Sequence, residues 1–337
     1  MSLNELWFLL IAVLFIGFFF LEGFDFGVGM STKLLARTDG ERRVLINSIG
    51  PFWDANEVWL ITAGGAMFAA FPEWYATLFS GYYTPFVFLL LALIARGVSF
   101  EFRGKIESER WKKTWDMAIF YGSLLPPLLF GVVFAGLIKG LPIGADKEMR
   151  AGLFDMVNGY TLLGGVTVVV LCLVHGLMFT TLRTTGELQT RARVMAGKLL
   201  LPLGILLAGF SVLTFIVTDL FEVRALPLTI TGILGAVAFL LAAYFIFRKK
   251  DSWAFGMTGA VIAISFALVF IGLFPRVMVS SIDKAYSLTI HNAASGQYSL
   301  KVMTIVALTL LPFVLGYQAW SYFIFHKRVN EKQPLEY

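Results

Sequence analysis

The residues with the clearest capacity for chemistry in this sequence are charged side chains inside apolar stretches. Glu22 and Asp25 lie three residues apart within a long apolar run, so they share one face of a helix. Asp54 and Glu57 repeat that spacing at the start of a second apolar run, and Arg96 lies inside a third. An ionisable group within a membrane span costs at least about 2.5–3.5 kcal/mol, which makes each one a candidate functional group. Carboxyl groups in such positions can take up and release protons.

Two more acids lie at the ends of apolar runs. Glu101 follows Arg96 by about one and a half helical turns, and Asp116 precedes the next run. These two and Asp54 are open to two interpretations. They line the mouth of an aqueous proton path from the cytoplasm, or they cap helices and reach toward the membrane surface.

Histidines offer little to a redox centre in this chain. Of the three, only His175, one turn after Cys172, lies deep in an apolar run. It is a candidate for a single axial haem ligand, or a polar residue that bonds a neighbouring helix. A second deep histidine for bis-histidine ligation is absent from the sequence, and no motif for a metal or nucleotide site occurs in a suitable context.

The amino-acid composition indicates what kind of protein positions these ionisable side chains. Of 337 residues, 58% are hydrophobic and 15% charged, against about 25% charged in a typical soluble domain. A soluble enzyme is excluded, and one cysteine excludes a disulfide scaffold. The net charge of +5 does not indicate a nucleic-acid partner, because the basic residues are distributed between apolar runs. The remaining class is an all-α, polytopic transmembrane helical bundle.

Nine apolar runs are long enough, or nearly long enough, to span a membrane, which takes about 20 residues. The second is short and must begin in the polar stretch near Pro51 to Asn56. Most Lys and Arg residues fall in loops on one side, which the positive-inside rule makes cytoplasmic. The amino terminus is then outside and the carboxyl terminus inside. The expected spans cover residues 6–30, 57–71, 78–100, 117–138, 161–182, 199–219, 226–247, 253–274 and 302–325.

A short internal similarity suggests a repeat. The segment from Arg37 to Glu41 resembles the segment from Arg183 to Glu187, and the same offset superimposes the first four spans on the next four. This predicts a four-helix unit over 1–140, a second over 141–275, and an outside loop, ninth helix and cytoplasmic tail over 276–337. The alternative is that both segments are ordinary polar cytoplasmic turns.

Three blocks in this order resemble subunit II of the cytochrome bd-type quinol oxidases. The blocks are Glu22-Gly23-Phe24-Asp25-Phe26-Gly27, Pro51-Phe52-Trp53-Asp54-Ala55-Asn56-Glu57-Val58-Trp59 and Arg96-Gly97-Val98-Ser99-Phe100-Glu101-Phe102-Arg103. The resemblance implies a bacterial cytoplasmic membrane complex that oxidises quinol and reduces oxygen to water with cytoplasmic protons. It also implies a larger subunit I that carries haem b, haem d and the quinol site, and no catalytic residue in this chain.

The resemblance assigns roles by position. Asp25, Trp53, Arg96 and Asp116 match residues associated with assembly or stability of the haem region, whereas Asp25, Asp54 and Glu101 match a proposed proton-entry route. Glu22 and Glu57 join that route as further acids near the same face. The resemblance leaves open whether this subunit binds a quinone or lipid, and whether a small single-span subunit completes the complex.

Two other functions compete with proton supply. A proton-coupled secondary transporter would also explain parallel repeats and membrane carboxyls, but it predicts a substrate site at the bilayer midplane rather than acids near one face. A scaffold that only shields the partner's haems would need no proton path.

Overall fold

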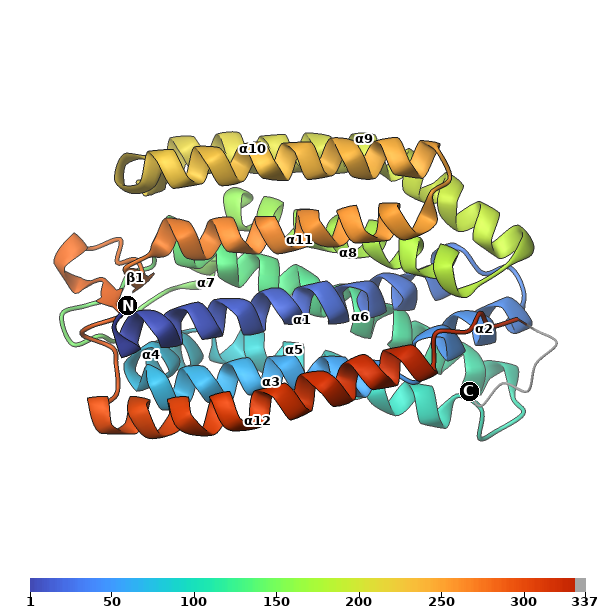
Figure 1. Ribbon diagram of the computed structural model, residues 1–337, viewed down its shortest axis with the longest axis horizontal. Helices are drawn as coiled ribbons and strands as arrows, with labels where there is room; N and C mark the ends of the chain where they lie inside the picture. The colour runs from blue at the N-terminus through green and yellow to red at the C-terminus, as the bar shows by residue number, and fades with distance from the viewer. Residues whose placement is uncertain (331–337) are drawn as a thin grey trace.

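The computed structural model describes residues 1–330, and the last part of the predicted cytoplasmic tail, 331–337, lies outside that range. The described chain is a bundle of long helices with a small two-stranded antiparallel sheet at one end (Figure 1). The helices of the first half are α1 (Leu3–Leu34), α2 (Asp39–Ile49), α3 (Trp53–Ala70), α4 (Pro72–Gly81), α5 (Tyr83–Phe102) and α6 (Glu109–Lys139). The second half has α7 (Leu153–Met156), α8 (Gly159–Arg183), α9 (Gly186–Val217), α10 (Leu220–Phe247), α11 (Asp251–Leu273), β1 (Arg276–Met278), η1 (Lys284–Tyr286), β2 (Leu288–Thr289) and α12 (Gln297–Ile324).

Eight of the described helices are long and apolar enough to cross a membrane, namely α1, α5, α6 and α8 to α12. The all-α polytopic class is confirmed, but the count of nine spans is not. The second expected span corresponds to α3, which starts at Trp53, close to where the sequence required it. Its first turn and a half contains Asp54, Asn56 and Glu57, and the helix is only 18 residues long, so the apolar part that remains is too short to count as a span.

Other boundaries differ from the apolar runs because helices also continue through polar sequence. The third expected span is split by Tyr82 into the short α4, which begins with Pro72 in the first turn, and α5. In the second half, α9 starts thirteen residues before its apolar run, at Gly186 rather than 199. The sequence predicts a polar loop there, but the segment forms about the first three and a half turns of a continuous helix.

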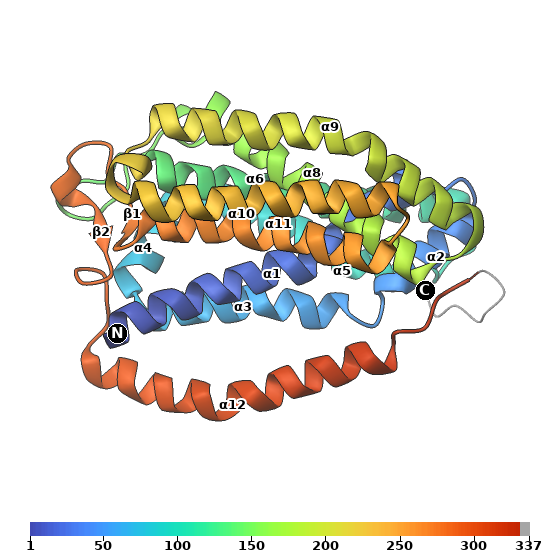
Figure 2. The same cartoon turned by 45° about the horizontal axis from the view of Figure 1, so that its top comes forward.

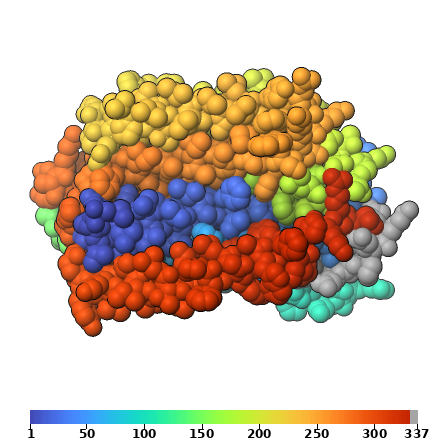
Figure 3. Space-filling view, viewed as in Figure 1, coloured from blue at the N-terminus to red at the C-terminus, as the bar shows by residue number. Residues whose placement is uncertain are grey.

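The bundle is built around α1, which packs against α3, α6, α8 and α11. Phenylalanines fill this core, and Phe19 of α1 stacks on Phe266 of α11 with ring centroids 3.7 Å apart. In contrast, α9 and α10 form an outer layer, and α12 lies along the opposite edge (Figures 1 and 2). Leu300 is the one fully buried residue of α12 within the described chain. Figure 3 shows α12 as a separate band, with the surface of α1 exposed between α12 and α11.

Glycines set the closest helix contact in the core. A Cβ atom built on Gly27 of α1 would lie 2.1 Å from the carbonyl oxygen of Cys172 and 2.7 Å from the Cα of Gly176, both on α8. The two backbones therefore touch, as in other small-residue contacts between membrane helices. This contact fixes the position of α1, the helix that carries Glu22 and Asp25, against α8.

Candidate proton-transfer site

Four ionisable residues from three helices form what we term the carboxyl–guanidinium cluster: Glu22 and Asp25 on α1, Glu57 on α3 and Arg96 on α5. Arg96 Nη1 forms an ion pair with Glu22 Oε1 and a second with Glu57 Oε1, which is 3.2 Å away. The side chains of Arg96 and Glu22 are 0% exposed, and that of Glu57 is 21% exposed. Asp25, also fully buried, interacts electrostatically with Arg96 and Glu57. The cluster is thus buried, with Glu57 on its accessible side.

Local packing brings Arg96 to this position. A Cβ atom on Gly122 of α6 would lie 2.6 Å from Arg96 Cβ and 2.7 Å from the carbonyl oxygen of Ala92, so only glycine allows this approach of α6 to α5. The guanidinium carbon lies 4.9 Å from the Phe26 ring centroid and 5.4 Å from that of Phe100. Aromatic faces stabilise a guanidinium without competing for its hydrogen bonds.

Asp25 is held by Asn56, which is not among the candidate residues that the sequence predicts. Asn56 Nδ2 donates to Asp25 Oδ2 at 2.6 Å, and Asn56 is completely buried. Its own Oδ1 accepts hydrogen bonds from Tyr322 Oη at 2.8 Å and Gln318 Nε2 at 3.3 Å, both on α12. Asn56 lies inside the second sequence block, between Asp54 and Glu57, and this was the available signal. Nothing local marks Tyr322 or Gln318, which are more than 260 residues away.

Several polar atoms of the cluster lack hydrogen-bond partners among the described residues. They are Glu22 Oε2, Asp25 Oδ1, Arg96 Nε and Arg96 Nη2. Buried polar atoms are usually bonded to protein or to ordered water, so a concentration of unpartnered atoms marks a hydrated or functional site. Two carboxyl oxygens and two guanidinium nitrogens supply both acceptors and donors for such water.

The other predicted residues lie around this cluster or apart from it. Asp54 and Glu101 are exposed, one at the start of α3 and one near the end of α5, and neither forms an ion pair with a described residue. Trp53 packs on Phe100 with ring centroids 5.2 Å apart and so joins the same two helices. Both exposed acids are therefore at the end of the bundle nearest to Glu57.

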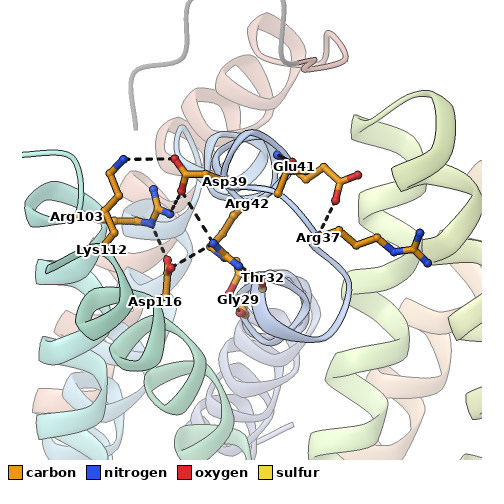
Figure 4. Close-up of polar contacts among 10 residues, drawn as sticks. Gly29, Thr32, Arg37, Asp39, Glu41, Arg42, Arg103, Lys112 and Asp116 are labelled. Atoms are coloured by element: carbon orange, nitrogen blue, oxygen red, sulfur yellow. Dashed lines mark hydrogen bonds and ion pairs between the residues drawn. The ribbon is translucent and has the colours of Figure 1, made fainter. Parts of the chain in front are cut away.

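Asp116 belongs to a different set of charges, the interhelix charge network of Asp39, Arg42, Arg103, Lys112 and Asp116 (Figure 4). Arg103 Nε donates to Asp116 Oδ1 at 2.6 Å, and its Nη2 pairs with Asp39. Arg42 Nη1 lies 3.4 Å from Asp116 Oδ2. The network fastens the short helix α2 to the ends of α5 and α6.

The interhelix charge network lowers the pKa of Asp39. Burial alone would raise the pKa, but the hydrogen bond from Arg103 and the charges of Arg103, Lys112 and Arg42 outweigh burial and lower it below the usual 3.8. The folded protein then binds fewer protons than the unfolded chain at low pH. Asp39 therefore stabilises the fold above about pH 4, and this contribution is lost as the pH falls through the folded-state pKa.

We expect the melting temperature of the purified complex to fall less steeply below about pH 4 in Asp39→Asn than in the wild type. The difference between the two should be constant above about pH 5 and should shrink on acidification. Glu148→Gln, which removes an exposed loop acid, is the control and should follow the wild type. A difference that stays the same at every pH would contradict the ion-pair account.

His175 bridges helices through both ring nitrogens. Its Nδ1 is 2.8 Å from Thr258 Oγ1 on α11 and its Nε2 is 3.1 Å from the carbonyl oxygen of Phe20 on α1. The ring also stacks on Phe255 at a centroid separation of 4.5 Å. Both nitrogens thus have partners within the chain, which is the arrangement of the polar-bridge interpretation. Residues 1–330 contain no group of three or more His, Cys, Asp or Glu side chains placed to hold a metal ion.

Comparison with known proteins gives the family. The sequence profile of the cytochrome bd terminal oxidase subunit II family matches residues 3–325. The chain is 58% identical over 336 residues to cytochrome bd ubiquinol oxidase subunit 2 of Bacillus subtilis (strain 168), covering 100% of this chain and 99% of the relative. It is 39% identical over 363 residues to cytochrome bd-I ubiquinol oxidase subunit 2 of Escherichia coli (strain K12), covering 98% and 96% of the two chains.

The fold agrees with that family. A chain in the structure of bd oxidase from Geobacillus thermodenitrificans matches with a TM-score of 0.73 and 19% identity, over 97% of this chain and 100% of the other. The resemblance inferred from the three sequence blocks is confirmed, and the family favours the oxidase over the transporter. With eight apolar helices, the protein is a multi-pass bacterial membrane protein. The chain belongs to the cytochrome bd terminal oxidase subunit II family and is one subunit, partnered by a subunit I, of a quinol:oxygen oxidoreductase complex.

Proposed function

We propose that the carboxyl–guanidinium cluster takes up protons from the cytoplasm and passes them toward a haem-bearing subunit I. The observation that carries this proposal is three carboxyl groups around one buried guanidinium, with unpartnered oxygen and nitrogen atoms. In the complex, haem b, haem d and the quinol site belong to the partner. Reduction of one O2 to two water molecules consumes four electrons and four protons, and this chain would supply a route for the protons.

Charge balance makes this cluster suited to holding protons. If Glu22, Asp25 and Glu57 were all ionised, Arg96 would leave the cluster with a net charge of −2. Isolated buried charge is costly in a low-dielectric interior, so protons are drawn in to reduce it. Because the carboxyls interact with one another, the protons belong to the cluster as a whole rather than to one residue. Loading and unloading can then occur at small cost.

The positions of the acids along their helices suggest a route. Asp54 and Glu101 are exposed near the helix ends, and Glu57 lies one turn further along α3 and is partly exposed. Arg96 is six residues before the end of α5, about 9 Å inward at 1.5 Å per residue. A proton would enter at Asp54 or Glu101, pass to Glu57 and reach Glu22 and Asp25 beside Arg96. Water on the unpartnered atoms would connect these steps.

The orientation proposed for this route follows the basic loops. The network of Arg42, Arg103 and Lys112 lies at the same end of α5 as Glu101. Basic residues are retained on the cytoplasmic side, so the mouth of the route would face the cytoplasm and the amino terminus the outside. A small single-span subunit and membrane lipids remain proposed neighbours of the exposed apolar helices.

An apolar cavity of about 400 Å³ lies between α1, α3, α4, α5 and α6. Its walls include Phe15, Phe68, Trp74, Phe86 and Phe134. A wall this apolar suits the isoprenoid tail of a quinone or the acyl chain of a lipid. Either would be a structural ligand of this subunit, away from the quinol site proposed for the partner.

We also propose that the chain consists of two similar units, 1–140 and 141–275, followed by a segment from 276 that contains α12. Helix pairings support this division. In the first unit α1 packs against α3 and α6, and α5 against α6; in the second α8 packs against α9 and α11, and α10 against α11. The units also meet reciprocally, α6 with α8 and α11 with α1. At the sequence offset that aligns Arg37 with Arg183, the pair α2 and α3 corresponds to the single α9 of the second unit.

Asp25→Asn tests the proposed proton role. Asparagine has the same shape and can still accept the hydrogen bond from Asn56, but it cannot carry a proton. We expect oxygen consumption per haem d to fall at least about tenfold, because a positioned acid–base group contributes about 10²–10⁴ to a rate. Haem content and recovery of subunit I should be unchanged. Glu109→Gln, an exposed acid at the start of α6, should keep wild-type turnover.

Two outcomes of this experiment would overturn the proposal. Unchanged turnover with full haem content would show that protons do not pass through Asp25. Loss of haem or of the partner subunit would assign Asp25 a structural role instead.

A further inference from the structure

Helix α12 is loosely attached to the bundle, yet two of its polar side chains enter the site. Gln318 and Tyr322 are four residues apart and therefore share one helix face. Trp59 Nε1 of α3 donates to Gln318 Oε1 at 2.9 Å. The Tyr322 ring stacks on Phe52 with centroids 4.5 Å apart and planes 4° from parallel. Both side chains are thus held in place by apolar or aromatic neighbours before they reach Asn56.

The two donors determine which way the Asn56 amide faces. Its Oδ1 accepts from Tyr322 Oη and from Gln318 Nε2, and this uses both lone pairs of the oxygen. The Nδ2 group must then point the other way, where it donates to Asp25 Oδ2. If the Asn56 amide were flipped, its oxygen would face Asp25, and it could accept a hydrogen bond from Asp25 only if that carboxyl were already protonated. By holding the amide in the other orientation, the two donors on α12 favour the deprotonated Asp25, which can accept a proton.

We propose that Tyr322 and Gln318 are positioning residues that act through Asn56 to orient Asp25 for proton uptake. Asp25 Oδ2 accepts from the Asn56 amide, whereas Oδ1 accepts from no described donor and the neighbouring Glu22 carboxyl can hydrogen-bond Asp25 only when one of the two acids carries a proton. Oδ1 is consequently the atom at which the proton arrives and leaves. This inference rests on the proposed function and extends it to a helix that carries no acid in the cluster.

The titratable groups around this arrangement come from several helices. Glu22 of α1, Glu57 of α3 and Arg96 of α5 all interact with Asp25 or with one another. On α8, Cys172 interacts electrostatically with Glu22. A change in the pH profile of turnover therefore reports the whole cluster, and a double-mutant comparison is needed to assign it to Asp25.

Tyr322→Phe in the whole complex is the test. Phenylalanine keeps the stack on Phe52 and removes only the hydroxyl. We expect haem content and the KM for quinol to stay at wild-type values, while kcat falls about threefold to tenfold, the effect of one lost hydrogen bond. The pH profile of kcat should shift as well. Gln318→Met, which removes the second donor, should act in the same direction, and exposed Tyr317→Phe should change nothing.

The decisive comparison uses Asp25→Asn as background. If Tyr322 acts through Asp25, adding Tyr322→Phe to Asp25→Asn should cause no further loss. Multiplying losses in the double variant, or wild-type kcat and pH profile in both Tyr322→Phe and Gln318→Met, would overturn the positioning inference. Wild-type turnover in Asp25→Asn itself would instead overturn the proposed function, so the two failures are distinguishable.

Discussion

Replacing Arg96 with leucine is expected to prevent accumulation of an intact, haem-containing complex. The substitution leaves Glu22 and Glu57 without their counter-charge, and the side chain of Glu22 is 0% exposed. Removal of one partner from a buried ion pair costs about 3–5 kcal/mol. That is a large part of the roughly 5–15 kcal/mol by which proteins are stable. The yield of complex, its haem spectrum and its melting temperature in detergent measure the effect.

Controls separate loss of the ion pair from loss of any arginine. Arg110→Leu removes an exposed arginine from α6 and should have little effect. Arg96→Lys keeps the charge but not the planar contact with Phe26 and Phe100, so an intermediate melting temperature is expected. Wild-type stability and haem content in Arg96→Leu would contradict the ion-pair description of the cluster.

Gly27→Val should disrupt the bundle as severely, for a steric reason. The new Cβ would lie 2.1 Å from the carbonyl oxygen of Cys172, and this neighbour is backbone that cannot turn aside. Overpacking of a well-packed core costs about 1–3 kcal/mol and more where backbones must separate. Since α1 carries Glu22 and Asp25, we expect a lower melting temperature together with loss of turnover.

Gly65→Ala is the matched control for this substitution. Gly65 is also a glycine in a helix, but a Cβ atom there meets no other atom within 4 Å. Its replacement should be neutral or slightly stabilising, because alanine favours helix. If Gly27→Val were as stable as Gly65→Ala, α1 and α8 would not be in backbone contact in the complex.

The sequence predicts most of the fold because backbone groups in a bilayer must be satisfied within each helix. Eight apolar runs are long helices at nearly the expected places. The exceptions are mixed segments. The acids and Asn56 at the start of α3 make it too polar to be read as a full span, and Pro72 and Tyr82 set α4 apart from α5. The start of α9 is helical although it is charged.

The site could be predicted only in part for a similar reason. The cost of burying Glu22, Asp25 and Arg96 is visible in the sequence, because charges in apolar runs are rare. Their mutual contacts are not visible in the sequence, because Arg96 and Glu22 are 74 residues apart. Arg96 reaches this position only because a glycine on a third helix lets α6 pack closely against α5. Asn56 carries no charge and is marked in the sequence only by its place between Asp54 and Glu57. Gln318 and Tyr322 have no local mark at all, so only the packing of α12 shows that they contact Asn56.

Proton uptake during a single reaction with oxygen tests the central claim most directly. The fully reduced complex is mixed with oxygen in weakly buffered detergent solution, with a pH-indicator dye and the haem absorbance followed together. In Asp25→Asn, we predict that proton uptake slows at least about tenfold while reduction of the haems by quinol keeps its wild-type rate. Proton uptake at the wild-type rate in a variant with full haem content would contradict the claim that the carboxyl–guanidinium cluster supplies the protons.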